Sequence, residues 1–266
     1  MSTRSLNVAA SGMSAQDKNV SNMANNIANS NTTGFKGGFM AFADLMYQDD
    51  KRSGGPVSDG TTTMVPSGIQ FGSGVAVNAI VKDFRQGDPL NTGDQLHVAV
   101  SGTGFFVIDL PDGTKSYTRD GTFMLDPSSG QIVTTLGYQL DQQIAIPPNY
   151  KRIVIKSDGS VWVDIPGQTA LQNVGHIQLA RFFNNGGLLA IGDNLFQETD
   201  ASGQPVLGNP QDDNYGKLMQ GWLEASNVDP IMEITNLIKA QRNYEMNSKV
   251  IQTADQMLKN VTDSKA

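Results

Sequence analysis

The segment Ser101-Gly102-Thr103-Gly104 has the small residues that let backbone N–H groups approach a phosphate. A dinucleotide-binding loop of this kind must open a helix, whereas Phe105 to Ile108 forms an apolar run typical of a strand. The sequence also contains no G-x-x-x-x-G-K-[ST], G-x-S-x-G or H-E-x-x-H pattern. We therefore predict a tight connection between two strands at this segment, and no bound cofactor.

Paired carboxylates are the other group that could do chemistry, because glycan hydrolysis needs two of them at a fixed separation. Many acidic residues here instead stand close to turn glycines, where a carboxylate stabilises the turn and stays solvated. Those residues are Asp59, Asp112, Asp120, Asp158 and Asp193. We predict no catalytic residues and no enzyme activity; a glycan-binding or glycan-hydrolysing wall-associated β protein is the alternative of a different class.

The sequence gives no support for a metal site and little for a sugar-binding site. The chain has no Cys and only two histidines, His97 and His176, which lie far apart, so no metal site is predicted. The asparagines from Asn25 to Asn31 could be read as sugar-binding amides, but their position at a helix end favours a capping role.

The charge distribution excludes other partner classes. A formal net charge of -7, without a clustered basic segment, argues against nucleic acid, and no small-molecule substrate is indicated. No apolar run is long enough to span a bilayer, and residues 1–13 lack an apolar secretory core. The expectation is a protein that is cytoplasmic or is exported without a cleaved signal peptide.

Glycine and proline divide the chain into helical ends and a non-helical middle. Every glycine except Gly12 lies between Gly34 and Gly221, and all 11 prolines lie between Pro56 and Pro230. Because both residues disfavour helix interiors, only the two ends are free to form long helices.

At both ends of the chain, mostly apolar residues recur at alternating spacings of three and four. This is the pattern of a helix that packs along one seam against a partner helix. The N-terminal helix is predicted to start near Ser2 and to fray at Asn29 to Asn31. The C-terminal helix is predicted to begin with Asp229 as cap and Pro230 as first residue. The apolar seam residues predicted to form an assembly interface are Leu6, Ala9, Met13, Val20, Met23, Ile27, Ile234, Leu237, Tyr244, Ile251 and Leu258.

Helices of this length need a partner, and two arrangements are open. The ends could pair only with each other as an antiparallel hairpin. However, two helices leave much of a broad apolar face uncovered, and small or polar seam residues such as Ala10, Gln16 and Ser248 suit packing among many helices. Packing between copies is therefore favoured.

The middle of the chain is predicted to be an antiparallel β domain. Runs of β-type residues alternate with turn signals, among them Asp112-Gly113 and Asp158-Gly159. The segment from Gln48 to Thr63 has only one large apolar residue, Val57, and alone would be extended or disordered. The predicted strands are Leu96 to Val100, Gly104 to Leu110, Gln131 to Thr135, Arg152 to Ile155, Ser160 to Ile165 and Ile177 to Phe183.

Short motifs at both ends and in the middle resemble those of the bacterial flagellar rod and hook family. They are Ala24 to Asn29 and Thr33 to Lys36 near the N-terminus, and Glu224 to Val228 followed by Gln241-Arg242, Tyr244-Glu245, Asn247, Lys249 and Thr253. The middle motifs are Gly102 to Phe106, Tyr117 to Gly121 and Ile191 to Leu195. Ser30 and Gly37-Gly38 depart from the family pattern and leave the local loop geometry open.

The resemblance implies an α+β protein whose terminal helices pack as a coiled-coil-like pair, with a central antiparallel β domain. The expected limits are an inner-tube domain formed by residues 1–30 and 226–266, an extended linker 31–70 with a polar insertion 47–66, and a β domain 71–225. Length and insertion resemble those of the distal rod, whose subunits form a helical polymer that transmits torque to the hook.

The resemblance also implies the partners and location: copies of the chain, proximal rod subunits, the hook protein and surrounding ring proteins, in a basal body spanning the periplasm. Export would use the flagellum's own secretion channel. A hook subunit is the nearest alternative, and the polar segment Asp49 to Thr63 distinguishes the two.

Overall fold

The computed structural model describes residues 2–51, 67–167 and 170–264, which form two compact units. Unit 1 contains Met1–Ile27, Gly38–Val81 and Asp229–Ala266, and unit 2 contains Ala28–Gly37 and Lys82–Val228. Each unit is therefore assembled from segments that are far apart in the sequence.

Two long helices dominate unit 1: α1 (Ser2–Ala28) and α2 (Pro230–Asp263). At 1.5 Å per residue they are about 40 and 51 Å long. Asp229 caps α2 as predicted, because its Oδ1 accepts hydrogen bonds from the backbone N–H groups of Ile231 (2.9 Å) and Met232 (3.3 Å). A turn at Asn29, whose carbonyl accepts from the Thr32 N–H, ends α1 where the sequence predicted fraying.

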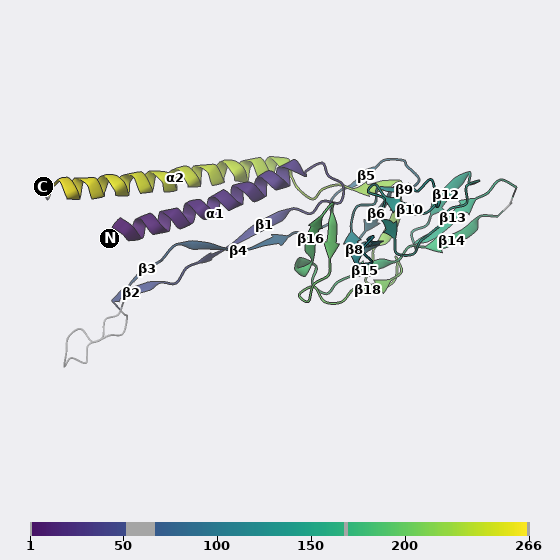
Figure 1. Cartoon of the computed structure of the whole chain (residues 1–266), viewed down its shortest axis with the longest axis horizontal. Helices are drawn as coiled ribbons and strands as arrows, with labels where there is room; N and C mark the ends of the chain where they lie inside the picture. The colour runs from purple at the N-terminus through teal and green to yellow at the C-terminus, as the bar shows by residue number, and fades with distance from the viewer. Residues whose placement is uncertain (1, 52–66, 168–169, 265–266) are drawn as a thin grey trace, which may run out of the picture. The chain divides into compact units, whose positions relative to one another are not determined.

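The two helices run antiparallel and side by side (Figure 1), with Gly12 opposite Asn247 and Asn26 opposite Glu233. Small residues set their separation. A Cβ atom at Gly12 would lie 2.8 Å from Asn247 Nδ2, so no side chain fits there without a shift. The described apolar residues that are buried in unit 1 are all alanines: Ala9, Ala15, Ala240 and Ala254.

Two strand pairs complete unit 1. Strand β1 (Gly38–Asp44) pairs with β4 (Val75–Lys82), and β2 (Gln48–Lys51) pairs antiparallel with β3 (Ile69–Phe71). Strands β1, β2 and most of β3 lie in the predicted extended linker 31–70, and β4 lies in the range predicted as β domain. Residues 52–66, most of the predicted polar insertion 47–66, lie outside the described residues.

Unit 2 is built from short antiparallel strands. Its largest sheet has the order β16-β17-β8-β7-β11-β10-β9, with β15 pairing to both β7 and β18. Three further groups are β12-β13-β14, β19-β6 and β20-β5. The bounds are β5 (Pro89–Asn91), β6 (Val98–Ser101), β7 (Phe105–Asp109), β8 (Lys115–Thr118), β9 (Phe123–Leu125), β10 (Ile132–Thr134), β11 (Gln139–Leu140), β12 (Arg152–Ile155), β13 (Ser160–Asp164), β14 (Gln172–His176), β15 (Leu179–Arg181), the 3-10 helix η1 (Asn185–Gly187), β16 (Leu189–Gly192), β17 (Leu195–Gln197), β18 (Val206–Gly208), β19 (Lys217–Gln220) and β20 (Trp222–Glu224).

The core of unit 2 consists of two buried apolar clusters. The larger one gathers aliphatic side chains and Phe106 from several strands. The smaller one is aromatic: Tyr117 meets Phe182 edge-on at a centroid distance of 4.7 Å, beside Phe105 and Phe196. These clusters explain why short strands with exposed turns hold together.

The six predicted strands are confirmed to within two residues at each end, and so is the α+β class. Both predicted turns are present, between β7 and β8 and between β12 and β13. Gly102 (φ 114°) and Gly104 (φ 132°) connect β6 directly to β7 in a backbone conformation that L side chains rarely adopt. This confirms a strand connection there in place of a phosphate-binding loop.

Candidate assembly surfaces

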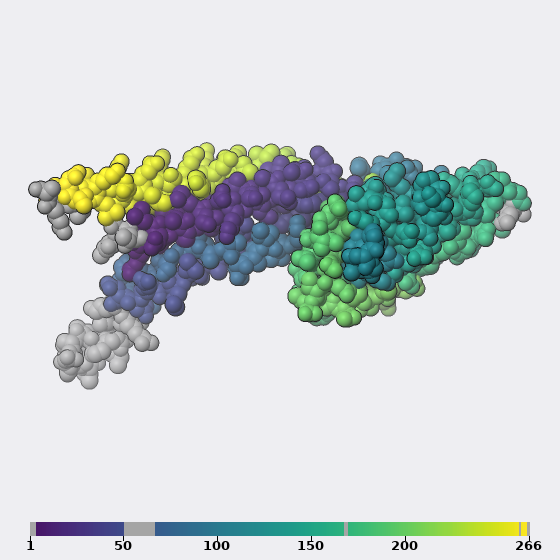
Figure 2. Space-filling model, viewed as in Figure 1, coloured from purple at the N-terminus to yellow at the C-terminus, as the bar shows by residue number. Residues whose placement is uncertain are grey.

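Helix α2 presents apolar side chains that its own unit does not cover. Ile231 is 76% exposed, and exposed apolar residues recur along the helix as far as Met257. Much of α2, coloured yellow-green to yellow, lies on the face drawn in Figure 2. Many exposed apolar side chains on one element are typical of an interaction surface in soluble proteins. The residues are Ile231, Met232, Ile234, Ile238, Tyr244, Met246, Val250 and Met257.

The strands of unit 1 add a second exposed apolar set. Met46, between β1 and β2, is 85% exposed, and neighbours on both strand pairs are also exposed. The residues are Phe39, Phe42, Leu45, Met46, Tyr47, Ile69, Phe71 and Ile80. In unit 1 the buried apolar residues are small alanines, and many large apolar side chains are exposed. A domain that is stable alone has the opposite arrangement, with its large apolar side chains inside.

The predicted interface residues occupy three different environments. Ala9 is buried between the helices, whereas Ile234 and Tyr244 are exposed. Leu6, Met13, Val20, Met23, Ile27, Leu237, Ile251 and Leu258 are half-buried. Their role in assembly stays a prediction, but all of them lie on the unit that carries the exposed apolar surface.

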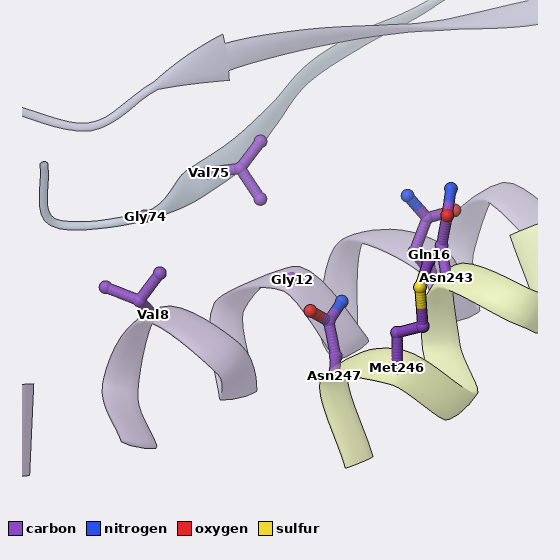
Figure 3. Close-up of a pocket in the computed structure, with 8 residues that line it drawn as sticks. All are labelled: Val8, Gly12, Gln16, Gly74, Val75, Asn243, Met246 and Asn247. Atoms are coloured by element: carbon purple, nitrogen blue, oxygen red, sulfur yellow. The ribbon is translucent and has the colours of Figure 1, made fainter. Parts of the chain in front are cut away.

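A groove lies where α1, α2 and the turn before β4 meet (Figure 3). It has a volume of about 340 Å³ and is lined by Val8, Gly12, Gln16, Gly74, Val75, Asn243, Met246 and Asn247. Gln16 Oε1 is buried there, and no hydrogen-bond donor among the described residues reaches it. Gly12, a glycine within the predicted N-terminal helix, is the residue whose type could have located this groove from the sequence.

The asparagines at the end of α1 hold β1 in place, which corrects the predicted capping role for Asn26. Its side-chain amide donates to Gly38 O (2.8 Å) and accepts from Gly38 N–H (3.0 Å), so it pairs with the strand as another backbone would. Asn22 also donates to Gly38 O, at 2.7 Å. Asn29 is the residue that bonds locally, to Thr32.

In unit 2, sequence motifs separated by almost 190 residues meet in a buried ionic cluster of Lys36, Arg119 and Glu224. Lys36 Nζ contacts Glu224 Oε1, and Arg119 Nη1 donates to Glu224 Oε2 at 3.2 Å. Gly87 N–H donates to the same carboxylate at 3.0 Å. All three charged residues are at most 5% exposed.

Burial disfavours the charged forms of Lys36 and Arg119, and the Glu224 carboxylate favours them. Burial lowers the pKa of Lys36, and the Glu224 carboxylate acts in the opposite direction. Burial likewise lowers the pKa of the Arg119 guanidinium. Glu224 is the carboxylate that both buried cations contact, which makes it the central residue of the cluster.

Hydrogen bonds extend the cluster to the other motifs. Asn227 Oδ1 accepts from Gly37 N–H (2.9 Å), and Asn227 Nδ2 donates to Asp83 O (2.8 Å). Thr33 Oγ1 donates to Asp120 Oδ1 (3.0 Å), and Asn194 Nδ2 donates to Thr33 O (2.8 Å). The segment 33–37 is therefore fixed on several sides, within unit 2, by residues from the middle and C-terminal motifs.

The turn carboxylates behave as structural groups. Hydrogen bonds from the Thr114 and Ser160 hydroxyl groups lower the pKa values of Asp112 and Asp158. A general acid in glycan hydrolysis needs the opposite shift. Among the described residues no group of three His, Cys, Asp or Glu is placed to hold a metal ion, and no helix is long and apolar enough to cross a membrane.

Three family models match the chain: "Flagella basal body rod protein" over residues 6–36, "Flagellar hook protein FlgE/F/G D1 domain" over 99–163 and "Flagellar basal body rod FlgEFG protein C-terminal" over 219–264. The three matched ranges contain the motifs that meet at the buried ionic cluster, including Lys36, Arg119 and Glu224.

Similar proteins span the same length. Flagellar basal-body rod protein FlgG of Caulobacter vibrioides is 50% identical over 96% of this chain and 97% of that protein. The proteins of the same name in Borreliella burgdorferi (46%; 96% of both chains) and Bacillus subtilis (38%; 98% of this chain, 99% of that protein) are also similar. The chain therefore belongs to the flagellar basal-body rod protein family, whose members are structural subunits and not enzymes.

Proposed function

We propose that this rod subunit assembles into the distal part of the rod, as a helical polymer that transmits torque to the hook. The observation that carries the proposal is the apolar exterior of unit 1, where Ile231, Ile234 and Tyr244 are exposed on α2. Apolar surface that one chain leaves in water is covered when copies pack together. The full-length similarity to flagellar basal-body rod proteins supports the same assignment.

In this proposal the terminal helices pair in a coiled-coil-like manner and line an inner tube, as residues 1–30 and 226–266. The eleven predicted seam residues, from Leu6 to Leu258, contact helices of neighbouring copies. The antiparallel contact at Gly12 and Asn247 supports the pairing, and the exposed Ile234 and Tyr244 support contacts beyond it.

The partners and location follow from a rod position. We propose contacts with proximal rod subunits, the hook protein and surrounding ring proteins, in a basal body that spans the periplasm. Export through the flagellum's own secretion channel, without a cleaved signal peptide, is part of the proposal.

The test is to place a charge on the exposed α2 surface in the full chain. Ile234→Glu and Tyr244→Glu should abolish sedimenting polymers, since an interface must then bury an unpaired carboxylate. The helical circular dichroism of the dilute chain should stay unchanged, because both side chains are exposed in unit 1.

Leu136→Glu is the matched control, because Leu136 is an exposed apolar residue of unit 2. That variant should polymerise like the parent chain. Normal polymers from both α2 variants, seen by electron microscopy, would count against assembly through the terminal helices.

A further inference from the structure

One side of α2 combines exposed methionines with cations. Met232, Lys239, Arg242, Met246, Lys249 and Met257, here called the Met/Lys stripe, follow each other at spacings that keep them within about 100° of the helix circumference. All six are exposed. A hollow of about 590 Å³ lies along its central part, lined by the three cations, Asn243, Glu245 and Met246.

The cations of the stripe have no ion-pair partner among the described residues of unit 1. The ion pair on α2 in the described structure joins Lys259 to Asp255, and Lys239, Arg242 and Lys249 take part in none of the ion pairs among the described residues. The three methionines are 57 to 60% exposed. Flexible, polarisable methionine side chains are well suited to bind an irregular apolar partner.

A segment of the same chain has the complementary chemistry. Residues Asp44 to Asp50, here called the acidic arm, read Asp-Leu-Met-Tyr-Gln-Asp-Asp and contain three carboxylates and no cation. Met46 and Tyr47 in its centre are exposed, and so are all three aspartates. Asp49 accepts a hydrogen bond from Gln70 at 2.7 Å, which holds the arm against β3.

The central part of the stripe and the acidic arm are similar in length and in the order of their groups. An extended arm from Asp44 to Asp50 spans about 20 Å, and the helix from Lys239 to Lys249 spans about 15 Å. In the central part of the stripe the cations Arg242 and Lys249 flank Met246, and in the arm aspartates flank Leu45, Met46 and Tyr47. Opposite charges around an apolar centre give specific contacts, while two like surfaces repel.

We propose that the Met/Lys stripe of one subunit binds the acidic arm of a second copy of this chain. Two different complementary surfaces on one chain form a head-to-tail contact, which repeats into an open helical polymer instead of a closed dimer. This inference rests on the proposed function and names a contact within it. Both surfaces are exposed in the single chain, so the contact forms without opening unit 1.

The absence of native cysteine allows a direct test in the full chain. Chains with Met46→Cys are mixed with chains that carry Met246→Cys and a different tag, and mild oxidation should join them across the contact. Met124→Cys is the matched control, because Met124 is 56% exposed, like Met246, but lies in unit 2. It should give only the background yield of disulfide.

Charge reversal gives the second readout. Replacing Lys239, Arg242 and Lys249 with Glu in the Met246→Cys chain should lower the cross-linking yield about tenfold, as expected for several exposed ion pairs turned into repulsions. Asp44→Lys, Asp49→Lys and Asp50→Lys in the Met46→Cys chain should restore it. Circular dichroism checks that α2 stays helical in each variant.

The outcomes separate this inference from the proposed function. Polymers that form while Met46 and Met246 cysteines cross-link no better than the Met124 control would overturn the stripe–arm contact alone. The contact would also be overturned if charge reversal lowers the cross-linking yield and the lysine variants do not restore that yield. Unmodified chains that form no polymer at all would overturn both proposals.

Discussion

At the scale of single residues, Glu224 supplies the negative charge that balances the cations of the buried ionic cluster. Its carboxylate contacts Lys36 and Arg119, both of which are almost fully excluded from solvent. Removing the shared anion from two buried cations costs far more than an ion pair at the surface contributes. The cluster is thus a point where one charge controls the position of segments distant in the sequence.

Glu224→Gln should lower the free energy of unfolding of unit 2 by about 3 kcal/mol or more, because two buried cations lose their counter-ion. Urea denaturation followed by tryptophan fluorescence measures the change. Arg85→Ala is the control: its partner is Asp83, but the Arg85 side chain is 83% exposed, so the loss should stay below about 1 kcal/mol. Equal losses in the two variants would contradict the assigned role of Glu224.

Tyr117 gives a pH dependence whose sign follows from burial. Desolvation, helped by the nearby Glu198 carboxylate, raises the pKa of its phenol above the ordinary value near 10. Above pH 10 the unfolded chain then releases a proton that the folded unit retains, so stability falls as pH rises. We expect the difference in unfolding free energy between parent and Tyr117→Phe to shrink from pH 9 to pH 11. A difference that is constant over this range would show that Tyr117 ionises normally.

At the scale of elements, the start of α2 depends on one side chain. Asp229 Oδ1 accepts two N–H groups that have no partner within the helix. Asp229→Ala should cost about 1 kcal/mol of helix stability, and Asp229→Asn should cost much less because its amide oxygen still accepts. The thermal midpoint of the circular dichroism signal at 222 nm compares the three chains; an unchanged midpoint in the alanine variant would contradict the capping role.

The elements were more predictable than the contacts between them. The helix interiors contain no proline and no glycine but Gly12, and Asp229-Pro230 marks a helix start. This is local information, and it placed both helices correctly. The side of α2 that faces α1 was not predictable in this way. Heptad spacing predicted Ile234 and Tyr244 as residues of an assembly interface, and both are exposed in the single chain. The spacing did not indicate that Ala240 and Ala254 would be the buried residues of α2, where alanines allow a closer approach of the helix backbones.

The contacts of the buried ionic cluster also could not be predicted from the sequence. Its motifs were recognisable one by one, yet Lys36 and Glu224 are separated by 188 residues and no periodicity links them. Only the pairing of β20 with β5 and the fold of unit 2 bring Glu224 beside residues 85–87 and Lys36. Asn26 was misassigned for the same reason, since its partner Gly38 is on a strand that local propensity did not predict.

For the whole molecule, the two units differ in what stabilises them. Unit 2 buries aromatic and aliphatic side chains, each contributing about 1.5–3 kcal/mol. The buried apolar residues described in unit 1 are alanines, which bury a single methyl group each. Unit 1 must therefore obtain much of its stability from contacts that a single chain does not make.

The isolated chain should consequently unfold in two steps, with unit 1 first. Both tryptophans, Trp162 and Trp222, lie in unit 2, so fluorescence follows that unit while circular dichroism at 222 nm is dominated by α1 and α2. We expect the helical signal to melt at a lower temperature than the fluorescence signal. Because polymer contacts stabilise only the folded form, raising the protein concentration should move the first transition upward and leave the second in place. Coincident transitions at every concentration would mean that unit 1 is stable alone, and its exposed apolar surface would then need another explanation.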